Sequence, residues 1–135
     1  VTVFNYIENI PGLMEASDMI IAKSGGLATT ECLCARLPLI LVGKSYGQER
    51  ANTLTVTAVG AAVTAETSEE LLKQLDQIHS DPTRLQTMLP GGETLRRPHA
   101  ARDIATTTLD MVGTIKPPKR HFAKVYWGKK PHRVR

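Results

Sequence analysis

Residues 19–42 decide the fold, and they read MIIAKSGGLATTECLCARLPLILV. Two apolar runs, at residues 19–22 and 39–42, are too short for helices and are bounded by polar or chain-breaking residues. The pair Gly25-Gly26 follows the first run, and residues 27–35 then have helical character. This order predicts two parallel strands, buried on both faces and joined by a right-handed crossover.

The same alternation continues on both sides of this unit. Residues 1–6 predict a further buried strand, and residues 61–63 predict a weak fourth one. The predicted helices are a short one from Pro11 and longer ones over 48–59, from Ser68, from Asp81 and over 99–112, with a loop at Pro90-Gly91-Gly92. The fold class is therefore α/β, a partial Rossmann-like parallel sheet flanked by helices. A complete Rossmann domain has about six strands, so we expect the missing ones before Val1.

Charge is divided unevenly along the 135 residues. Residues 1–115 hold nine basic and thirteen acidic side chains, whereas residues 116–135 hold eight basic and no acidic ones. We therefore expect a folded domain over 1–113 and a basic, flexible tail over 114–135. The tail can rest on an anionic membrane surface through residues 116–135, or it can simply be solvated. Aromatic residues make up only 4% of the chain, which argues against base stacking, so no nucleic-acid partner is expected.

The sequence lacks the signals of membrane-spanning, secreted and metal-binding proteins. No apolar run reaches the ~18 residues of a membrane span, and the N-terminus does not resemble a signal peptide. The two cysteines, Cys32 and Cys34, are interpreted as small thiols in a reducing compartment. The four histidines are scattered without a metal-binding spacing, so we expect neither a metal nor another cofactor. The predicted location is cytoplasmic.

A strand, a glycine turn and a helix start meet at residues 21–31, IAKSGGLATTE. Free backbone N–H groups and the helix dipole make such a helix start attractive to a phosphate, and glycine lets the phosphate approach closely. Thr29 or Thr30 can add a hydroxyl donor, and Glu31 can accept both hydrogens of a ribose diol. These residues predict a nucleotide diphosphate site. The alternative is that Gly25-Gly26 is only a tight turn and Glu31 only a favourable first-turn charge.

A second polar cluster lies at residues 46–52, YGQERAN, after the next strand. Parallel strands end at one edge of the sheet, where α/β domains bind ligands, so the two clusters share that edge. Gln48, Glu49 and Asn52 can form directional hydrogen bonds with the hydroxyl groups of an uncharged hexose. The alternative is a solvated first helical turn.

Several pieces of the sequence occur in an order and spacing that are typical of one enzyme family. They are Tyr6-Ile7-Glu8-Asn9-Ile10-Pro11-Gly12-Leu13-Met14, Ala16-Ser17-Asp18-Met19-Ile20-Ile21, Lys23-Ser24-Gly25-Gly26-Leu27, Thr30-Glu31, Leu37-Pro38, Gly47-Gln48-Glu49, Asn52 and Gly60-Ala61-Ala62. Together they resemble the C-terminal, donor-binding domain of the GT-B glycosyltransferases of family 28. The resemblance is good over about residues 1–63 and extends over 64–113 only as helical pattern. The Gln48-Glu49 pair is more similar to the glycolipid enzymes, the processive diacylglycerol glucosyltransferases and monogalactosyldiacylglycerol synthases, than to the peptidoglycan enzyme.

The resemblance implies a role for each matching residue. The main chain at Ile7 would contact uracil, and Glu31 would bind the ribose. The diphosphate would lie against the β-strand-to-helix loop and helix start, formed by Ser24, Gly25, Gly26, Leu27 and Thr30. Gln48 and Glu49 would contact the donor sugar, and Asn52 would support their loop. The implied substrates are a UDP-sugar and a lipid acceptor such as diacylglycerol, and the implied location is the cytoplasmic face of a membrane.

In this family the catalytic base and the acceptor site belong largely to an N-terminal domain that these 135 residues do not match. We therefore assign no catalytic residue here and expect no sugar transfer by the isolated chain. Three alternatives stay open. They are a peptidoglycan-type UDP-N-acetylglucosamine transferase, a donor-binding subunit completed by a partner chain, and a UDP-N-acetylglucosamine 2-epimerase.

Overall fold

The computed structural model describes residues 2–114. The predicted basic tail and its membrane contact fall on residues 115–135, outside the described part, and the predicted domain limits of 1–113 and 114–135 stay a prediction. Contacts divide the chain into two compact units, residues 1–98 and 99–135. The first unit holds the sheet, and the second contributes one described helix, α6 (Ala100–Thr114). No helix within residues 2–114 is both long and apolar enough to cross a membrane.

The first unit is built on one parallel sheet with the order β1-β2-β3. Its strands are β1 (Ile20–Ala22), β2 (Leu39–Val42) and β3 (Ala62–Ala65). The register pairs Ile20 with Leu39, and Leu39 in turn with Ala62. The central strand β2 is hydrogen-bonded on both sides, and its first three residues are at most 3% exposed. This burial on both faces explains why its sequence, LILV, is continuously apolar.

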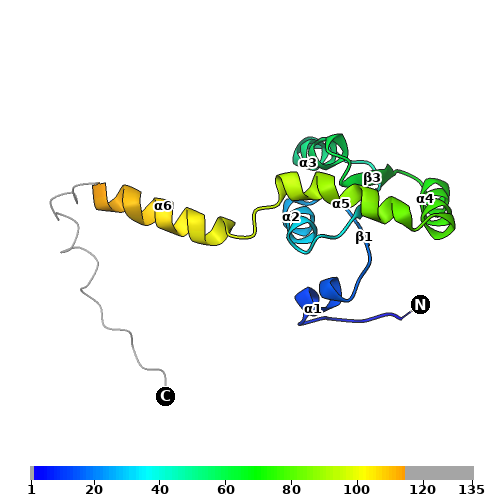
Figure 1. The fold of residues 1–135 in the computed structure, drawn as a ribbon, viewed down its shortest axis with the longest axis horizontal. Coiled ribbons are helices and arrows are strands. Elements are labelled where there is room, and N and C mark those ends of the chain that lie inside the picture. Colours follow the sequence, from blue (N-terminus) through cyan, green and yellow to red (C-terminus); the bar gives the residue numbers. More distant parts are fainter. Residues whose placement is uncertain (1, 115–135) are drawn as a thin grey trace, which may run out of the picture. The chain divides into compact units, whose positions relative to one another are not determined.

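Helices connect the strands and cover the sheet (Figure 1). After α1 (Ile10–Glu15), helix α2 (Gly26–Cys34) joins β1 to β2, and α3 (Gly47–Ala58) joins β2 to β3. Right-handed crossovers between successive neighbouring strands place α2 and α3 on the same face, and the two helices are in contact. Their buried side chains form one core with β2 and the start of β3. The core residues are Cys32, Leu33, Leu37, Leu39, Leu41, Val56, Ala61 and Ala62.

Helix α5 (Thr83–Leu95) closes this core, because it contacts α2, α3 and the preceding helix α4 (Ser68–Ser80) (Figure 1). Two polar contacts reinforce its packing on α2. The Arg36 guanidinium pairs with the Glu93 carboxylate at 2.5 Å, and Arg96 Nε donates to the Cys34 carbonyl at 3.1 Å. Helix α4 begins with a side-chain cap, in which the Thr67 hydroxyl accepts from the Glu70 N–H.

The predicted α/β class and parallel sheet are confirmed, and the predicted strand at 39–42 has the observed bounds. The strand predicted at 1–6 is wrong over residues 2–6, which have no regular secondary structure. The side chains of Val3 and Tyr6 in this segment are more than 80% exposed. A strand is stable only when it pairs with a neighbour, and none of the described strands pairs with this segment. The burial predicted on both faces of β1 is also wrong, because Ile21 is 43% exposed on a strand that has one neighbour.

The loop predicted at Pro90-Gly91-Gly92 is wrong as well, because α5 continues through all three residues. The physical reason is close packing. A Cβ atom on Gly91 would lie 1.9 Å from the carbonyl oxygen of Val59, at the end of α3, so only glycine allows the two backbones to approach this closely. Proline and glycine are poor helix formers, but here tertiary packing overrides their propensity.

The close approach of α5 to Val59 generates a stability prediction. The change Gly91→Ala forces a methyl group into the Val59 carbonyl, so we expect the free energy of unfolding to fall by at least ~2 kcal/mol. The neighbouring change Gly92→Ala is the matched control, because its Cβ would make only ordinary van der Waals contacts, with the Leu33 side chain at 3.5 Å and the Ala61 Cβ at 3.8 Å. Urea unfolding should find that control at or above the parent stability, since alanine favours a helix over glycine. Equal destabilisation by the two changes would contradict this account of the packing.

Candidate functional site

The candidate site lies where β1 and β2 end. β1 is followed by the β1–α2 loop (residues 23–25), and β2 is followed by the β2–α3 loop (residues 43–46). The strands are parallel, so both loops and the N-termini of α2 and α3 lie at the same edge of the sheet. The two sequence clusters therefore share one edge, as predicted.

Helix α2 begins without a side-chain cap. Its N-cap is Gly25, whose extended backbone (φ −64°, ψ 144°) leads directly into Gly26. The first N–H bonded within the helix is that of Thr29, which donates to the Gly25 carbonyl at 3.0 Å. The N–H groups of Gly26, Leu27 and Ala28 precede it and have no helical acceptor. This end of α2 therefore offers several backbone donors, together with the positive end of the helix dipole, to an anion.

The fold itself does not require glycine at the start of α2. Neither Gly25 nor Gly26 has a positive φ. Among the described glycines, only Gly43, Gly47 and Gly60 have one. A Cβ atom on Gly25 would meet nothing within 4 Å, and one on Gly26 would meet only Asn52 Nδ2 at 3.9 Å. Neither turn geometry nor packing explains the pair, so the interpretation of Gly25-Gly26 as merely a tight turn loses its physical basis. Open space against an uncapped helix start is what a phosphate needs.

A side chain of α3 holds the β1–α2 loop in place. Asn52 Nδ2 donates to the carbonyl of Ser24 at 2.9 Å, and Ser24 is only 3% exposed. The sequence assigned Asn52 to the support of a loop, but not to the loop that it actually bonds, which lies 28 residues earlier. This hydrogen bond couples the starts of α2 and α3 and brings Ser24, Gly26 and Asn52 together.

The first turn of α3 carries the other polar candidates. Gly47 has a φ of +53°, which explains why glycine precedes Gln48 and Glu49. Side chains four and three residues apart lie on one side of a helix, so Gln48 and Glu49 share the side of α3 that carries Asn52 and faces α2. Gln48 is exposed and Glu49 half-buried.

The two threonines of α2 differ in their bonding. The Thr30 hydroxyl donates to the Gly26 carbonyl at 2.7 Å, so its hydrogen is committed and a ligand can use only its lone pairs. Thr29 is 5% exposed, and its hydroxyl has no partner. It lines a pocket of about 220 Å³ between α2 and α3, to which Gly26 and Asn52 also contribute. The Thr29 hydroxyl is thus a buried donor without a partner in the first turn of α2.

Glu31 and Cys32 follow in α2 with opposite surroundings. Glu31 is exposed and forms no ion pair with any other described residue, so its carboxylate is free to accept from hydroxyl groups. Cys32 is fully buried, and burial, followed by the nearby charge of Glu31, raises the pKa of its thiol to about 11. The thiol is therefore neutral at physiological pH and is not an activated nucleophile.

Among the predicted site residues, Ile7 has no hydrogen bond or shared pocket that connects it with the others within the described part of the chain. It is half-buried in the segment before α1, and its backbone forms no hydrogen bond with another backbone group of residues 2–114. Its N–H and carbonyl are thus free, but its contact with a base stays a prediction. Sequence reasoning also missed Thr53, whose hydroxyl lies 3.0 Å from the Glu49 carbonyl and 3.3 Å from the Ser45 hydroxyl, tying the β2–α3 loop to α3.

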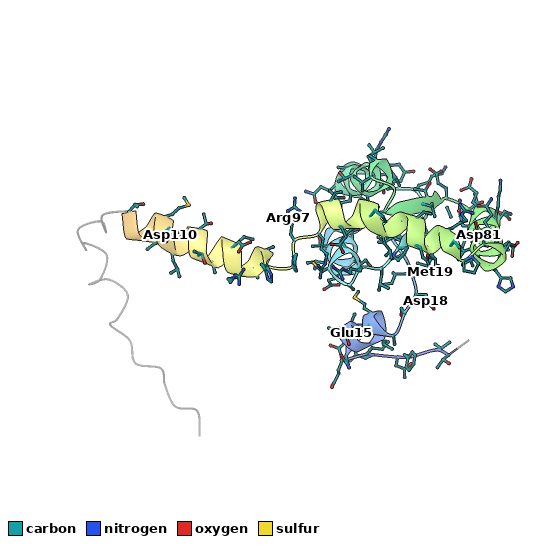
Figure 2. All side chains as sticks on the ribbon, in the orientation of Figure 1. Glu15, Asp18, Met19, Asp81, Arg97 and Asp110 are labelled. Atoms are coloured by element: carbon teal, nitrogen blue, oxygen red, sulfur yellow. The ribbon has the colours of Figure 1, made fainter. Side chains whose placement is uncertain are left out.

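A larger pocket, of about 660 Å³, lies at the opposite edge of the sheet. It is lined by Glu15 and Asp18, labelled in Figure 2, together with Leu37 before β2 and His79 near the end of α4. The ends of α2 and α4 and the start of α5 all reach this pocket, so helix dipoles give it no single sign of potential. The described residues contain no group of three or more side chains able to hold a metal ion.

Comparison with known proteins points to one family. The profile of the glycosyltransferase family 28 C-terminal domain matches residues 1–104. A processive diacylglycerol beta-glucosyltransferase of Bacillus cereus (strain AH187) is 32% identical over 107 residues, which cover 79% of this chain and 28% of that protein. The protein of the same name from Bacillus thuringiensis (strain Al Hakam) is 31% identical over 108 residues, 80% of this chain and 28% of its own length. The chain thus spans little more than a quarter of these relatives.

The bond between Asn52 and Ser24 can be tested directly. The change Asn52→Asp keeps the side-chain size but turns a carboxylate toward the Ser24 carbonyl, so the bond is lost. We expect the free energy of unfolding to fall by about 1–3 kcal/mol and the amides of residues 24–26 to exchange hydrogen faster. The change Thr55→Val is the control, because this exposed hydroxyl bonds only to its own helix, at the Ala51 carbonyl. Unchanged exchange in the Asn52 variant would rule out the coupling of the β1–α2 loop to helix α3.

Proposed function

The chain belongs to the glycosyltransferase family 28 C-terminal domains, and from this premise we propose that it is the UDP-sugar-binding part of a hexosyltransferase that acts on a lipid acceptor such as diacylglycerol. The observation that carries the proposal is the uncapped start of α2 behind Gly25 and Gly26, two glycines that the fold does not require.

In this proposal the diphosphate of the donor lies against the first turn of α2. The N–H groups of Gly26, Leu27 and Ala28 donate to its oxygens, and the absence of a Cβ atom at Gly25 lets the phosphate reach them. The Thr29 hydroxyl, which has no partner, supplies a further donor to the diphosphate or to a bridging water molecule. Asn52 takes no part in the binding itself but holds the loop through Ser24.

The nucleoside and the sugar occupy the two flanks of this diphosphate. The Glu31 carboxylate, exposed and without an ionic partner among the described residues, accepts the two hydrogens of the ribose diol. Ile7 contributes main-chain groups to the uracil. Gln48 and Glu49 face α2 from the first turn of α3 and bind hydroxyl groups of the hexose, which makes them the residues that select the sugar.

The reaction that suits this arrangement is direct displacement at the anomeric carbon, with UDP as the leaving group. Negative charge grows on the diphosphate as the glycosidic bond to it breaks. Fixed N–H groups and the dipole of α2 stabilise that charge without having to reorganise. The general base and the acceptor lipid are assigned to parts of the enzyme beyond these residues, because the chain spans only 28% of its diacylglycerol-glucosyltransferase relatives.

Two substitutions separate the nucleotide from the sugar. In the natural protein that contains these 135 residues, Glu31→Ala should weaken UDP binding about 10- to 100-fold, because two hydrogen bonds to a charged acceptor are lost. Gln48→Ala should leave UDP binding within about twofold and instead reduce the preference among UDP-glucose, UDP-galactose and UDP-N-acetylglucosamine. Titration calorimetry with UDP and competition between the three donors measure the two effects.

The control for these variants is Glu15→Ala, which removes an exposed carboxylate at the opposite edge of the sheet and should change neither property. If Glu31→Ala binds UDP as well as the Glu15 variant does, the ribose assignment is wrong. An equal loss of UDP affinity in the Gln48 variant would remove the distinction between the nucleotide side and the sugar side.

A further inference from the structure

A pocket of about 350 Å³ lies against the first turns of α3, and no part of the proposed donor site uses it. We call it the α3 pocket. The β2–α3 loop and helix α3 supply most of its lining, and Glu66 after β3 completes it. The lining residues from the loop and the helix are Lys44, Ser45, Tyr46, Arg50, Thr53 and Leu54.

Helix geometry separates the α3 pocket from the donor side. Gln48 and Asn52 are four residues apart and share the side of α3 that faces α2, where Asn52 bonds to the β1–α2 loop. Arg50 and Leu54 are likewise four residues apart and share a side. Successive residues turn by about 100°, so that second side is about 200° away from the first. The side of α3 that carries Arg50 and Leu54 is therefore distinct from the side that carries Gln48 and Asn52, although Thr53 of the lining bonds to the Glu49 carbonyl.

The charges of the pocket favour an anion. Lys44 and Arg50 are both exposed, and neither forms an ion pair with a described residue. The start of α3 adjoins them, and its N-cap, Tyr46, provides no side-chain cap, so the positive end of the helix dipole is also available. Glu66 contributes the one carboxylate of the lining, against two cations.

Hydroxyl groups line the pocket as well. Thr53 and Ser45 lie 3.3 Å apart, and Thr53 also lies 3.0 Å from the Glu49 carbonyl. Thr53 has one hydrogen, and the shorter contact directs it to the Glu49 carbonyl, so in the 3.3 Å contact the Ser45 hydroxyl donates to the Thr53 oxygen. Two cations beside a helix start match a tetrahedral phosphate oxyanion, which accepts several hydrogen bonds at once, and the two hydroxyl groups line the same pocket.

The rim of the pocket indicates where that phosphate comes from. Tyr46 is 73% exposed and Leu54 is 59% exposed, although both are large apolar side chains. Exposed tyrosine and leucine beside lysine and arginine are typical of a surface that lies at a membrane interface, where the apolar groups enter the headgroup layer and the cations meet its phosphates.

We propose that the α3 pocket binds the phosphate group of an anionic lipid headgroup. Lys44 and Arg50 contact the phosphate, and Tyr46 and Leu54 enter the lipid surface beside it. The site goes beyond the proposed donor site, does not depend on which sugar is transferred, and is tested by binding alone. Together, the two sites place the membrane on one side of α3 and the nucleotide sugar on the other.

The test uses the full 135-residue chain and vesicles of equal parts phosphatidylglycerol and phosphatidylcholine, with pure phosphatidylcholine vesicles as the baseline. The double variant Lys44→Gln/Arg50→Gln should bind the anionic vesicles about 30-fold more weakly, since each basic residue near such a surface contributes about fivefold. The control Lys73→Gln/Arg102→Gln removes the same charge from exposed positions outside the pocket and should lose only a few-fold. Equal losses of vesicle affinity in the two double variants would overturn the proposal, because they would show that the vesicles respond to the net charge of the chain and not to a specific site.

Two further measurements guard against a folding artefact and identify the source of the phosphate. Glu66→Gln removes the opposing carboxylate, so it should strengthen vesicle binding, a gain that a damaged fold does not produce. Glycerol phosphate should shift the amide resonances of residues 44–47 and 50 in the parent chain. Shifts without a vesicle difference between the double variants would assign the pocket to a soluble phosphate compound and overturn the lipid source. Neither shifts nor a vesicle difference would overturn the phosphate site itself.

Discussion

The position of β2 at the centre of a parallel sheet constrains everything else in the first unit. β2 bonds to β1 on one side and β3 on the other, and its first three residues are almost fully buried. Parallel neighbours cannot be joined by tight turns, so the chain must return over one face through α2 and then α3. Both helices therefore begin at the same edge of the sheet. Two helix N-termini, neither capped by a side chain, meet there as a direct consequence of the topology.

An uncapped helix start is a local cost that the fold accepts at this edge. A capping side chain contributes about 1 kcal/mol relative to alanine but only a few tenths relative to glycine, and α4 of the same chain has one in Thr67. At α2 the corresponding residue is Gly25, which gives up that small difference and leaves backbone donors facing open space. Natural sequences depart from good local design mainly where function requires it. The loop is kept in place from outside instead, by the amide of Asn52 on the carbonyl of Ser24.

The sequence predicted what depends on local pattern and missed what depends on distant partners. The apolar run at 39–42 and the glycine break after β1 identify strand, turn and helix by themselves. Gly91 was misjudged because its role depends on Val59, a residue on another helix, and no local pattern reveals a backbone contact of that kind. The segment at 2–6 has the composition of a strand, yet composition does not supply a pairing partner. Likewise, the polar residues of the site were found by type, whereas the bond from Asn52 to Ser24 required the fold.

The net charge of residues 1–115 and the local potential at the sheet edge have opposite signs. Residues 1–115 carry four more acidic than basic side chains, so the domain as a whole repels anions. An anionic ligand must therefore be recognised by positive potential that is concentrated locally, and the carboxyl edge of the sheet concentrates it in two ways. At α2 the potential comes mainly from backbone N–H groups, which suits the diphosphate that we propose as the leaving group. At α3 the positive potential comes from the side chains of Lys44 and Arg50 beside the helix start. Such side chains suit the proposed membrane surface, which is bound but does not react. Because one helix carries both sides, contact with a membrane at Arg50 would fix the orientation of Gln48 and Glu49 relative to the proposed lipid acceptor.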